Sequence, residues 1–244
     1  MHCIGVPAPL GGPIRQSLTT AAPGLSRVTV RDAESKLHLE ALGVTGRVVP
    51  DSVWALPTVW PLDVLRVVHR GLVASGRLPN TPYLAVHLSD WQATIDEDIA
   101  DALATVHDRS LPVVLVPLGP CMGDEGTARQ LATRTGTHAL LGSNVVERTA
   151  AIALSHGYMG MGLHGGIVAA GYGRPTVWLR DNPKVRASAR FLGGPRIGRT
   201  ETLAYIAEDL VRGVHDVDVE RTATLAADAR REIGECLDEL LHGC

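Results

Sequence analysis

The sequence predicts an α/β protein built from Rossmann-type units, in which helices flank sheets of parallel strands. Three observations lead to this fold class. Short apolar runs alternate with segments of helical periodicity along most of the 244 residues, a pattern typical of repeated strand–helix–strand units. Glycine and proline break the pattern between runs and helices. A composition of 45% hydrophobic and 20% charged residues supplies enough apolar side chains for one large core or two modest ones.

The expected elements follow this alternation in order. The expected strands are the short apolar runs at residues 3–6, 27–30, 47–49, 83–88, 112–117, 138–141, 157–161 and 176–179. The expected helices lie between them, at residues 33–42, 61–75, 95–109, 127–133, 146–155, 166–170 and 184–192. Helical spacing of apolar residues with mixed charge predicts two more helices in the tail, one after residue 200 and one across 219–241.

The expected domain boundary lies where Gly, Pro and Asn interrupt the pattern after residue 76. Residues 1–76 have room for about three strands and are predicted to form a partial N-terminal Rossmann-like domain. Residues 77–199 hold a complete doubly wound unit, whose ligands should lie beyond the carboxyl ends of the strands. Residues 200–244 are predicted to be packing helices without chemistry.

Composition excludes several classes of function. A net charge of −3 offers no basic surplus for a nucleic-acid partner. The four cysteines are scattered without paired spacing, which argues against a zinc site or a disulfide framework and favours a reducing compartment. Neither a signal peptide nor an apolar stretch of membrane-spanning length is found. We therefore expect a cytoplasmic protein with at most peripheral membrane association.

The segment from Gly157 to Pro175 contains seven glycines around one histidine, His164. Glycine costs backbone entropy unless the chain turns tightly or approaches another group closely. One interpretation is a strand–loop–helix anion site, in which backbone N–H groups and the helix dipole hold a phosphate or carboxylate. The other is a crossover in which glycines only allow close packing of helix and strand, and the glycines alone do not decide between the two.

His164 stands out from the other histidines because glycines flank it at a predicted strand end. An imidazole titrates near neutrality and can move protons in either direction, so this side chain is a candidate general acid or base. His156, eight residues earlier, lacks the spacing and the acidic neighbours of a metal pair, and we assign no metal. A serine hydrolase is excluded by the lack of a Gly-x-Ser-x-Gly motif.

Charged residues follow other predicted strands. Arg31 could offer its planar guanidinium to an anion, or it could pair with the adjacent loop while Asp32 caps the next helix. Lys184 is either an anion ligand or a solvated helix start. Asp51 is best explained as a turn residue, and the acids at 124 and 125 as caps of the following helix.

Four ordered segments resemble the polysaccharide pyruvyltransferases. They are VTVRDAES, LGVTGRVVPDSVWALP, VVLVPLGPCMGDEG and MGMGLHGGIVAAGYGRPTVWL with DNPKV after it, and together they cover about residues 28–194. The resemblance implies a GT-B arrangement of two Rossmann-like domains. It also implies transfer of pyruvate from phosphoenolpyruvate to a sugar or lipid-linked glycan as a ketal, without a cofactor, in cell-surface or exopolysaccharide biosynthesis.

The resemblance assigns roles to particular residues. It makes His164 and Arg31 the candidate catalytic residues, with His164 acting as the acid or base or as a phosphate ligand. The candidate substrate-binding residues are Gly162, Leu163, Gly165, Gly166, Lys184 and Asp32.

Two features of the chain depart from the family pattern. Many members carry an arginine at the position of Gly162, and the N-terminal part is shorter here than is usual. Two alternatives therefore stand beside the pyruvyltransferase. One is a GT-B nucleotide-sugar glycosyltransferase or epimerase, which ranks lower because residues 165–179 contain no acid to clamp a ribose. The other is a truncated, non-catalytic remnant.

Overall fold

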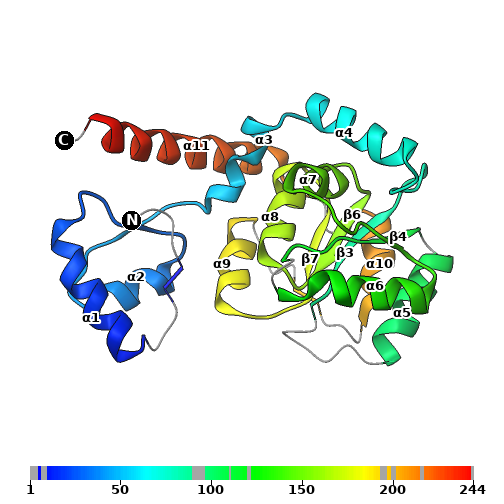
Figure 1. The fold of residues 1–244 in the computed structure, drawn as a ribbon, viewed down its shortest axis with the longest axis horizontal. Coiled ribbons are helices and arrows are strands. Elements are labelled where there is room, and N and C mark those ends of the chain that lie inside the picture. Colours follow the sequence, from blue (N-terminus) through cyan, green and yellow to red (C-terminus); the bar gives the residue numbers. More distant parts are fainter. Residues whose placement is uncertain are drawn as a thin grey trace. The chain divides into compact units, whose positions relative to one another are not determined.

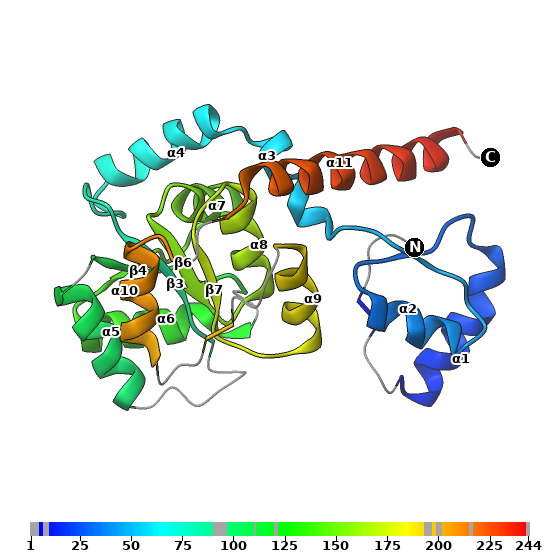
Figure 2. The ribbon, with the colours of Figure 1, turned by 180° about the vertical axis from the view of Figure 1, so that it is seen from behind.

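The computed structural model describes residues 5–6, 10–89, 97–109, 111–119, 122–192, 197–198, 202–214 and 217–242. The chain forms two compact units (Figures 1 and 2). Unit 1 combines residues 1–58 with residues 223–244, and unit 2 comprises residues 59–222. Each unit contains a sheet of parallel strands, as the sequence predicts.

The sheet of unit 2 has five strands in the order β5-β4-β3-β6-β7, all parallel. Their bounds are β3 Leu84–His87, β4 Val113–Leu115, β5 His138–Ala139, β6 Gly157–Gly160 and β7 Thr176–Trp178. The chain moves outward from β3 to β4 and β5 and then returns to place β6 on the other side of β3. The crossovers therefore diverge between β3 and β6, and ligands of open α/β sheets bind at the carboxyl ends of strands at such a point.

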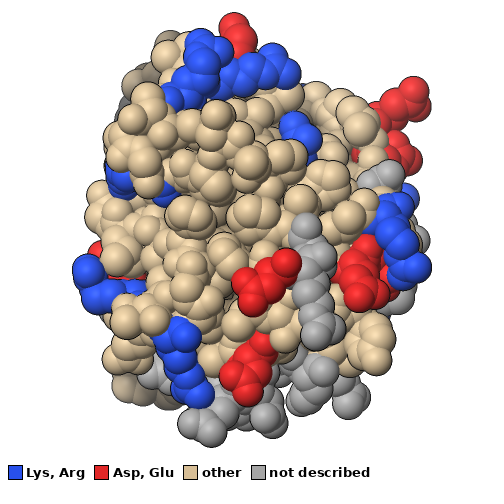
Figure 3. All heavy atoms as spheres, turned by 90° about the vertical axis from the view of Figure 1, so that its right-hand side faces the viewer, with Lys and Arg blue, Asp and Glu red and all other residues tan. Residues whose placement is uncertain are grey.

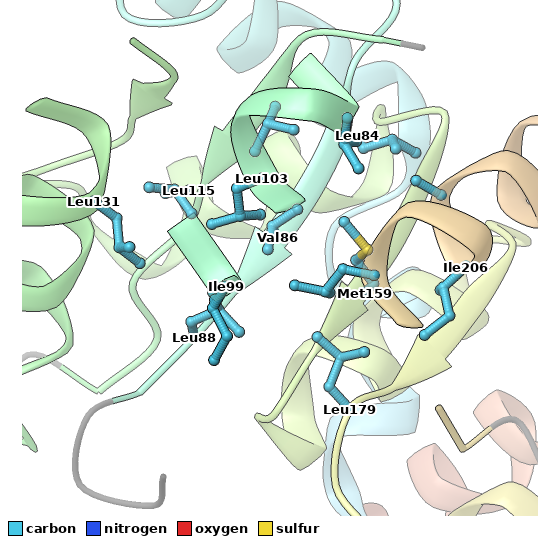
Figure 4. Packing of buried hydrophobic residues seen from close by; sticks show 14 of the residues in the cluster. Leu84, Val86, Leu88, Ile99, Leu103, Leu115, Leu131, Met159, Leu179 and Ile206 are labelled. Atoms are coloured by element: carbon cyan, nitrogen blue, oxygen red, sulfur yellow. The ribbon is translucent and has the colours of Figure 1, made fainter. Parts of the chain in front are cut away.

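Helices cover both faces of this sheet, with α5, α6 and α10 on one face and α7 and α8 on the other (Figures 1 and 2). The helices of unit 2 are α4 Leu62–Ala74, α5 Glu97–Arg109, α6 Asp124–Thr135, α7 Val145–Ala153, α8 Leu163–Gly171, α9 Pro183–Phe191 and α10 Leu203–Val211. Figure 4 shows the core on the first face, where Val86 and Met159 of the strands pack against Leu103 of α5 and Ile206 of α10. Burial of such side chains supplies most of the favourable free energy of folding.

Unit 1 is smaller and depends more on charged groups. Its elements are α1 Gly12–Ala21, η1 Ala22–Gly24, β1 Thr29–Val30, α2 Ala33–Glu40, β2 Arg47–Val48 and η2 Ser52–Ala55, with the later part of α11 Val219–His242. α3, Leu56–Val59, lies at the boundary between the units. On α11, the buried carboxylate of Glu232 accepts hydrogen bonds from both terminal nitrogens of Arg47 and lies 3.6 Å from Arg27.

Most predicted elements are present, and their ends move by at most three residues. The predicted strand at residues 3–6 is wrong in its described half, because Gly5 and Val6 pair with no other strand. Val6 instead donates its N–H to Ser35 Oγ at 2.8 Å and accepts from His38 Nδ1 at 2.7 Å. The other half lies outside the described residues. Helix α1 was not predicted, and it buries none of its residues.

The compact units divide the chain differently from the predicted domains. α4 packs against α7 and so belongs to unit 2, although it precedes the predicted boundary at residue 76. The predicted packing helices are split between the units, since α10 lies in unit 2 and most of α11 in unit 1.

Figure 3 shows the side of unit 2 on which α4 and α5 end. Basic side chains gather at the top of this face, where α4 lies, and its centre carries few charged groups. None of the helices in the described ranges has both the length and the apolar character needed to cross a bilayer.

Candidate functional site

The loop between β6 and α8 lies at the edge of the sheet where the crossovers diverge. β3 and β6 pair in register, with His87 opposite Gly160. Helix α8 begins at Leu163, three residues earlier than predicted, with Gly162 as its N-cap. Leu163 and His164 thus occupy the first turn, where backbone N–H groups have no partner within the helix and the dipole is positive. The His164 side chain is exposed.

Two glycines at the start of α8 are required for close packing. Gly165 and Gly166 are buried. A Cβ atom on Gly165 would collide with the hydroxyl of Tyr158, and one on Gly166 would collide with the indole of Trp178. The close-packing interpretation therefore explains these two positions, and their predicted role in substrate binding stays a prediction.

The N–H and the carbonyl of Gly162 are both hydrogen-bonded to neighbouring side chains. Its N–H donates to His87 Nδ1 at 3.0 Å, and its carbonyl accepts from the Tyr158 hydroxyl at 3.3 Å. A Cβ atom at this position would lie 2.8 Å from Leu118 Cδ1 and 3.0 Å from His87 Nδ1. The site where many family members carry arginine is therefore filled here by His87 and Leu118. The N–H of Gly162 is also already used by His87, so it is not a candidate anion donor.

A buried polar cluster lies beneath this loop, and the sequence did not predict it. The carboxylate of Asp124 accepts hydrogen bonds from His87 Nε2 at 2.8 Å, from Ser89 Oγ at 2.9 Å and from the N–H of Gly119 at 2.6 Å. His87, Ser89 and Asp124 are each less than 5% exposed. Asp124 is the first residue of α6, but its predicted capping role is wrong: Gly123 is the N-cap, without a side-chain bond, and the Asp124 carboxylate reaches back to β3. The available signal was a histidine at the end of a predicted central strand.

The pKa values of Asp124 and of the neighbouring Tyr158 are both shifted. Burial alone would raise the pKa of Asp124, but hydrogen bonds and charge from His87, together with Gly119 and Ser89, lower that pKa below its usual value. Burial, and secondarily the charge of Asp124, raise the pKa of Tyr158 far above its usual value. Tyr158 is therefore a hydrogen-bond donor at neutral pH, as its bond to the Gly162 carbonyl requires.

Lys184 lies on the first turn of α9, which follows β7, the strand next to β6. The side-chain oxygen of Asn182 caps α9 by accepting from the N–H of Val185 at 2.9 Å. Helices α8 and α9 pack against each other (Figure 1). The exposed side chains of His164 and Lys184 therefore belong to the first turns of two neighbouring helices.

The predicted site residues of unit 1 have local partners. Arg31 Nη1 lies 3.2 Å from Asp51 Oδ2, and Asp32 Oδ1 accepts from the N–H of Ser35 at 2.7 Å. Asp32 thus caps α2, as one of the two interpretations held. Asp51 also accepts from the N–H of Val53 at 3.1 Å, so its predicted turn role is confirmed. The anion-binding role of Arg31 stays a prediction.

Metal ligation has no candidate cluster within the described ranges. No group of three or more His, Cys, Asp or Glu side chains there is placed to hold an ion.

Comparison with solved structures identifies the fold class. UDP-GlcNAc 2-epimerase from Neisseria meningitidis, bound to UDP-GlcNAc, matches with a TM-score of 0.59 at 11% identity, over 93% of this chain and 64% of its own. HepE from Anabaena in complex with UDP matches with a TM-score of 0.60 at 16% identity, over 100% of this chain and 71% of its own. An assigned UDP-N-acetylglucosamine 2-epimerase from Listeria monocytogenes gives a TM-score of 0.58 at 15% identity, covering 96% and 64%. The chain thus has a GT-B-type fold and spans about two thirds of the length of these proteins.

The sequence profile of the polysaccharide pyruvyl transferase family matches residues 4–183. Because this match covers well over half of the 244 residues, the chain belongs to that family. The resemblance inferred from four ordered motifs is confirmed. A search of curated proteins finds no sequence match.

Proposed function

We propose that this protein transfers pyruvate from phosphoenolpyruvate to a sugar, forming a ketal in cell-surface or exopolysaccharide biosynthesis. Family membership supports a transferase. The observation that carries the proposal for this chain is the exposed His164 on the first turn of α8, at the carboxyl end of β6, beside a helix whose first turn carries the exposed Lys184. The reaction would take place in the cytoplasm, with membrane contact at most peripheral.

The proposed reaction exchanges one phosphate ester for two carbon–oxygen bonds. A proton adds to the methylene carbon of phosphoenolpyruvate, and the central carbon becomes electrophilic. One sugar hydroxyl adds to that carbon, phosphate leaves, and a second hydroxyl closes the ketal. The two hydroxyl protons balance the proton taken up by carbon and the proton carried away on phosphate.

The residues of unit 2 would supply binding and proton transfer. The first-turn amides of α8 and the helix dipole suit the donor phosphate. The ammonium group of Lys184 would supply a point charge for the phosphate or the carboxylate. His164 would deliver the proton to carbon or hydrogen-bond the phosphate. These assignments give two roles for His164 that kinetics can separate.

The test compares the parent with His164→Gln and His164→Ala. Binding of phosphoenolpyruvate is measured by calorimetry, and phosphate release is measured with a panel of glycans. If His164 transfers the proton, kcat falls about 10²–10⁴-fold in both variants while the dissociation constant of the donor stays near that of the parent. If His164 only binds phosphate, the dissociation constant rises in His164→Ala, and glutamine, which keeps a hydrogen-bond donor, restores part of the affinity.

His156→Ala is the matched control, since His156 is also exposed but precedes β6 and so lies at the opposite end of that strand. It should bind and react as the parent does. UDP-glucose serves as the second ligand, because the structural neighbours include complexes with UDP and UDP-sugars. Heat with UDP-glucose and none with phosphoenolpyruvate would replace the proposal by the nucleotide-sugar alternative. Heat with neither, and no phosphate release, would leave the non-catalytic alternative.

A further inference from the structure

The buried cluster beneath the α8 loop joins three loops at the carboxyl edge of the sheet through one carboxylate. Asp124 begins α6 and binds two groups that follow or end β3, the His87 imidazole and the Ser89 hydroxyl. It also binds the N–H of Gly119, in the loop after β4. Through His87, this carboxylate is connected to Gly162, in the loop after β6. The strand ends linked in this way include those of β3 and β6, between which the crossovers diverge.

The partners of His87 determine its tautomer. A backbone N–H can only donate, so Nδ1 must be the acceptor in its contact with Gly162. The proton of the neutral ring is then on Nε2, where it is donated to Asp124. Asp124 accepts all three of its bonds and so requires a donor at Nε2. The carboxylate and the Gly162 amide therefore select the same state of the ring.

Besides the hydrogen bond, the backbone of Gly162 packs closely against the His87 ring. A Cβ atom on Gly162 would come within 3.0 Å of Nδ1, so only a glycine places its peptide this close to the ring without displacement. The next two carbonyls are also bound, that of Gly162 by the Tyr158 hydroxyl and that of Leu163 by Trp178 Nε1 at 3.2 Å. The peptides entering α8 are thus fixed on the side facing the sheet.

We propose that His87 and Asp124 are positioning residues of the donor site. Asp124 fixes the imidazole tautomer, and the imidazole fixes the Gly162 peptide and with it the amides of Leu163 and His164. The proposal rests on the function proposed above. A buried polar cluster of this kind gains little stability over an apolar one of equal volume, so its placement under the loop is what gives it a role. Neither residue touches the donor.

Two substitutions of His87 separate its two hydrogen bonds. In His87→Asn, the side-chain oxygen replaces Nδ1 and can still accept from Gly162, but the bond to Asp124 is lost. In His87→Gln, the side-chain NH2 replaces Nε2 and can still donate to Asp124, but the acceptor for Gly162 is lost. Both variants should lose stability. Ser89→Ala is the matched control, because it removes a different hydrogen bond to Asp124 and leaves Gly162 untouched.

The measurements are hydrogen exchange at the Gly162 amide, by NMR on the full chain, and the dissociation constant of phosphoenolpyruvate. In His87→Gln, exchange at Gly162 should be about threefold to tenfold faster and donor affinity weaker by a similar factor, the effect of one net hydrogen bond. In His87→Asn and Ser89→Ala, both quantities should stay within about twofold of the parent, although stability falls. A purely structural role would instead change all three variants in proportion to their lost stability.

The proposal is overturned if His87→Asn and His87→Gln weaken donor binding equally, or if Gly162 exchange is the same in both. Its failure is distinguishable from that of the proposed function. If the parent binds no phosphoenolpyruvate, the proposed function fails, and the exchange measurement alone then decides whether His87 holds Gly162. Faster exchange in His87→Gln only would support the positioning role, and equal exchange would overturn it.

Discussion

The carboxyl edges of the two sheets use the same kinds of residue in different ways. In unit 1, Arg31 follows β1 and Asp51 follows β2, and the two side chains bind each other at 3.2 Å. In unit 2, the buried groups at the edge, His87 and Asp124, satisfy one another, while His164 and Lys184 remain exposed. The polar side chains after the strands of unit 1 thus bind one another, whereas those of unit 2 include both a buried cluster and exposed side chains on the adjacent helices α8 and α9.

The units also differ in what stabilises them. Unit 2 buries apolar side chains from strands and from three helices in one cluster. The cluster of unit 1 has four fully buried members, Val6, Val30, Leu39 and Val44. Unit 1 adds the ion pairs of Arg27 and Arg47 with the buried Glu232. Substitutions should therefore act through packing and the buried cluster in unit 2, and through charge in unit 1.

The largest expected effect is that of Asp124→Asn. An amide at this position must donate where Gly119 or His87 already donates, which leaves a buried donor unpaired. The free energy of unfolding of unit 2 should fall by about 3 kcal/mol at neutral pH, measured by urea denaturation. Asp181→Asn is the control, because Asp181 is exposed and pairs with the exposed Arg186, and it should change stability by less than about 0.5 kcal/mol.

The effect of Asp124→Asn should depend on pH with a definite sign. The folded-state pKa of Asp124 is lowered, so its contribution is full above the unfolded value of about 3.9 and is lost as pH falls through the folded value. The difference in stability between parent and variant should therefore shrink below about pH 4. A difference that grew on acidification would contradict the lowered pKa.

Gly166→Ala should have the next largest effect. The added methyl group would meet the buried Trp178 indole, and overpacking of this kind costs roughly 1–3 kcal/mol. Gly126→Ala is a matched control within helix α6, where a Cβ atom meets nothing within 4 Å. Alanine there should raise stability, by up to about 1 kcal/mol. Equal responses at the two positions, measured by thermal unfolding, would show that close packing does not explain Gly166.

Periodicity and motif order were enough to predict the strands of unit 2, and the apolar runs of four of them, β3, β4, β6 and β7, are buried throughout. The same rules missed α1, which buries no residue and so leaves no apolar spacing. They also placed the domain boundary by a local break at residue 76, whereas contacts between α4 and α7, far apart in sequence, decide where the compact unit begins.

The exposed residues of the candidate site could be predicted from the sequence, but the buried residues beneath them could not. His164 and Lys184 carry local signals, a glycine-flanked histidine and a lysine at a helix start. His87 and Asp124 are 37 residues apart, and nothing local indicates that they meet. A buried histidine within a helix or strand has the same sequence signature whether or not it binds a distant carboxylate.

In unit 1, Glu232→Gln should lower stability by about 2 kcal/mol. Glu232 is 2% exposed and accepts from Arg47, so a neutral amide would leave charged donors without an equal partner. Glu235→Gln is the control, since its side chain is 41% exposed and its ion pairs are screened by solvent. Hydrogen exchange at Arg47 and Val49, whose N–H groups donate to the carbonyls of Val28 and Val30, should report the loss in unit 1. A loss confined to unit 2 amides would contradict the assignment of α11 to unit 1.

The smallest expected effect is that of Lys184→Ala, a substitution of an exposed residue of the candidate site. Lys184→Ala should weaken phosphoenolpyruvate binding about threefold to fivefold at low salt, because one exposed cation contributes up to about 1 kcal/mol toward an anion and is screened by added salt. Its thermal stability should stay unchanged. Lys36→Ala is the control, because Lys36 lies in unit 1 and pairs with Glu40 at 3.6 Å. Equal losses of donor affinity in both variants would indicate a general effect of net charge, and Lys184 would then have no specific part in the site.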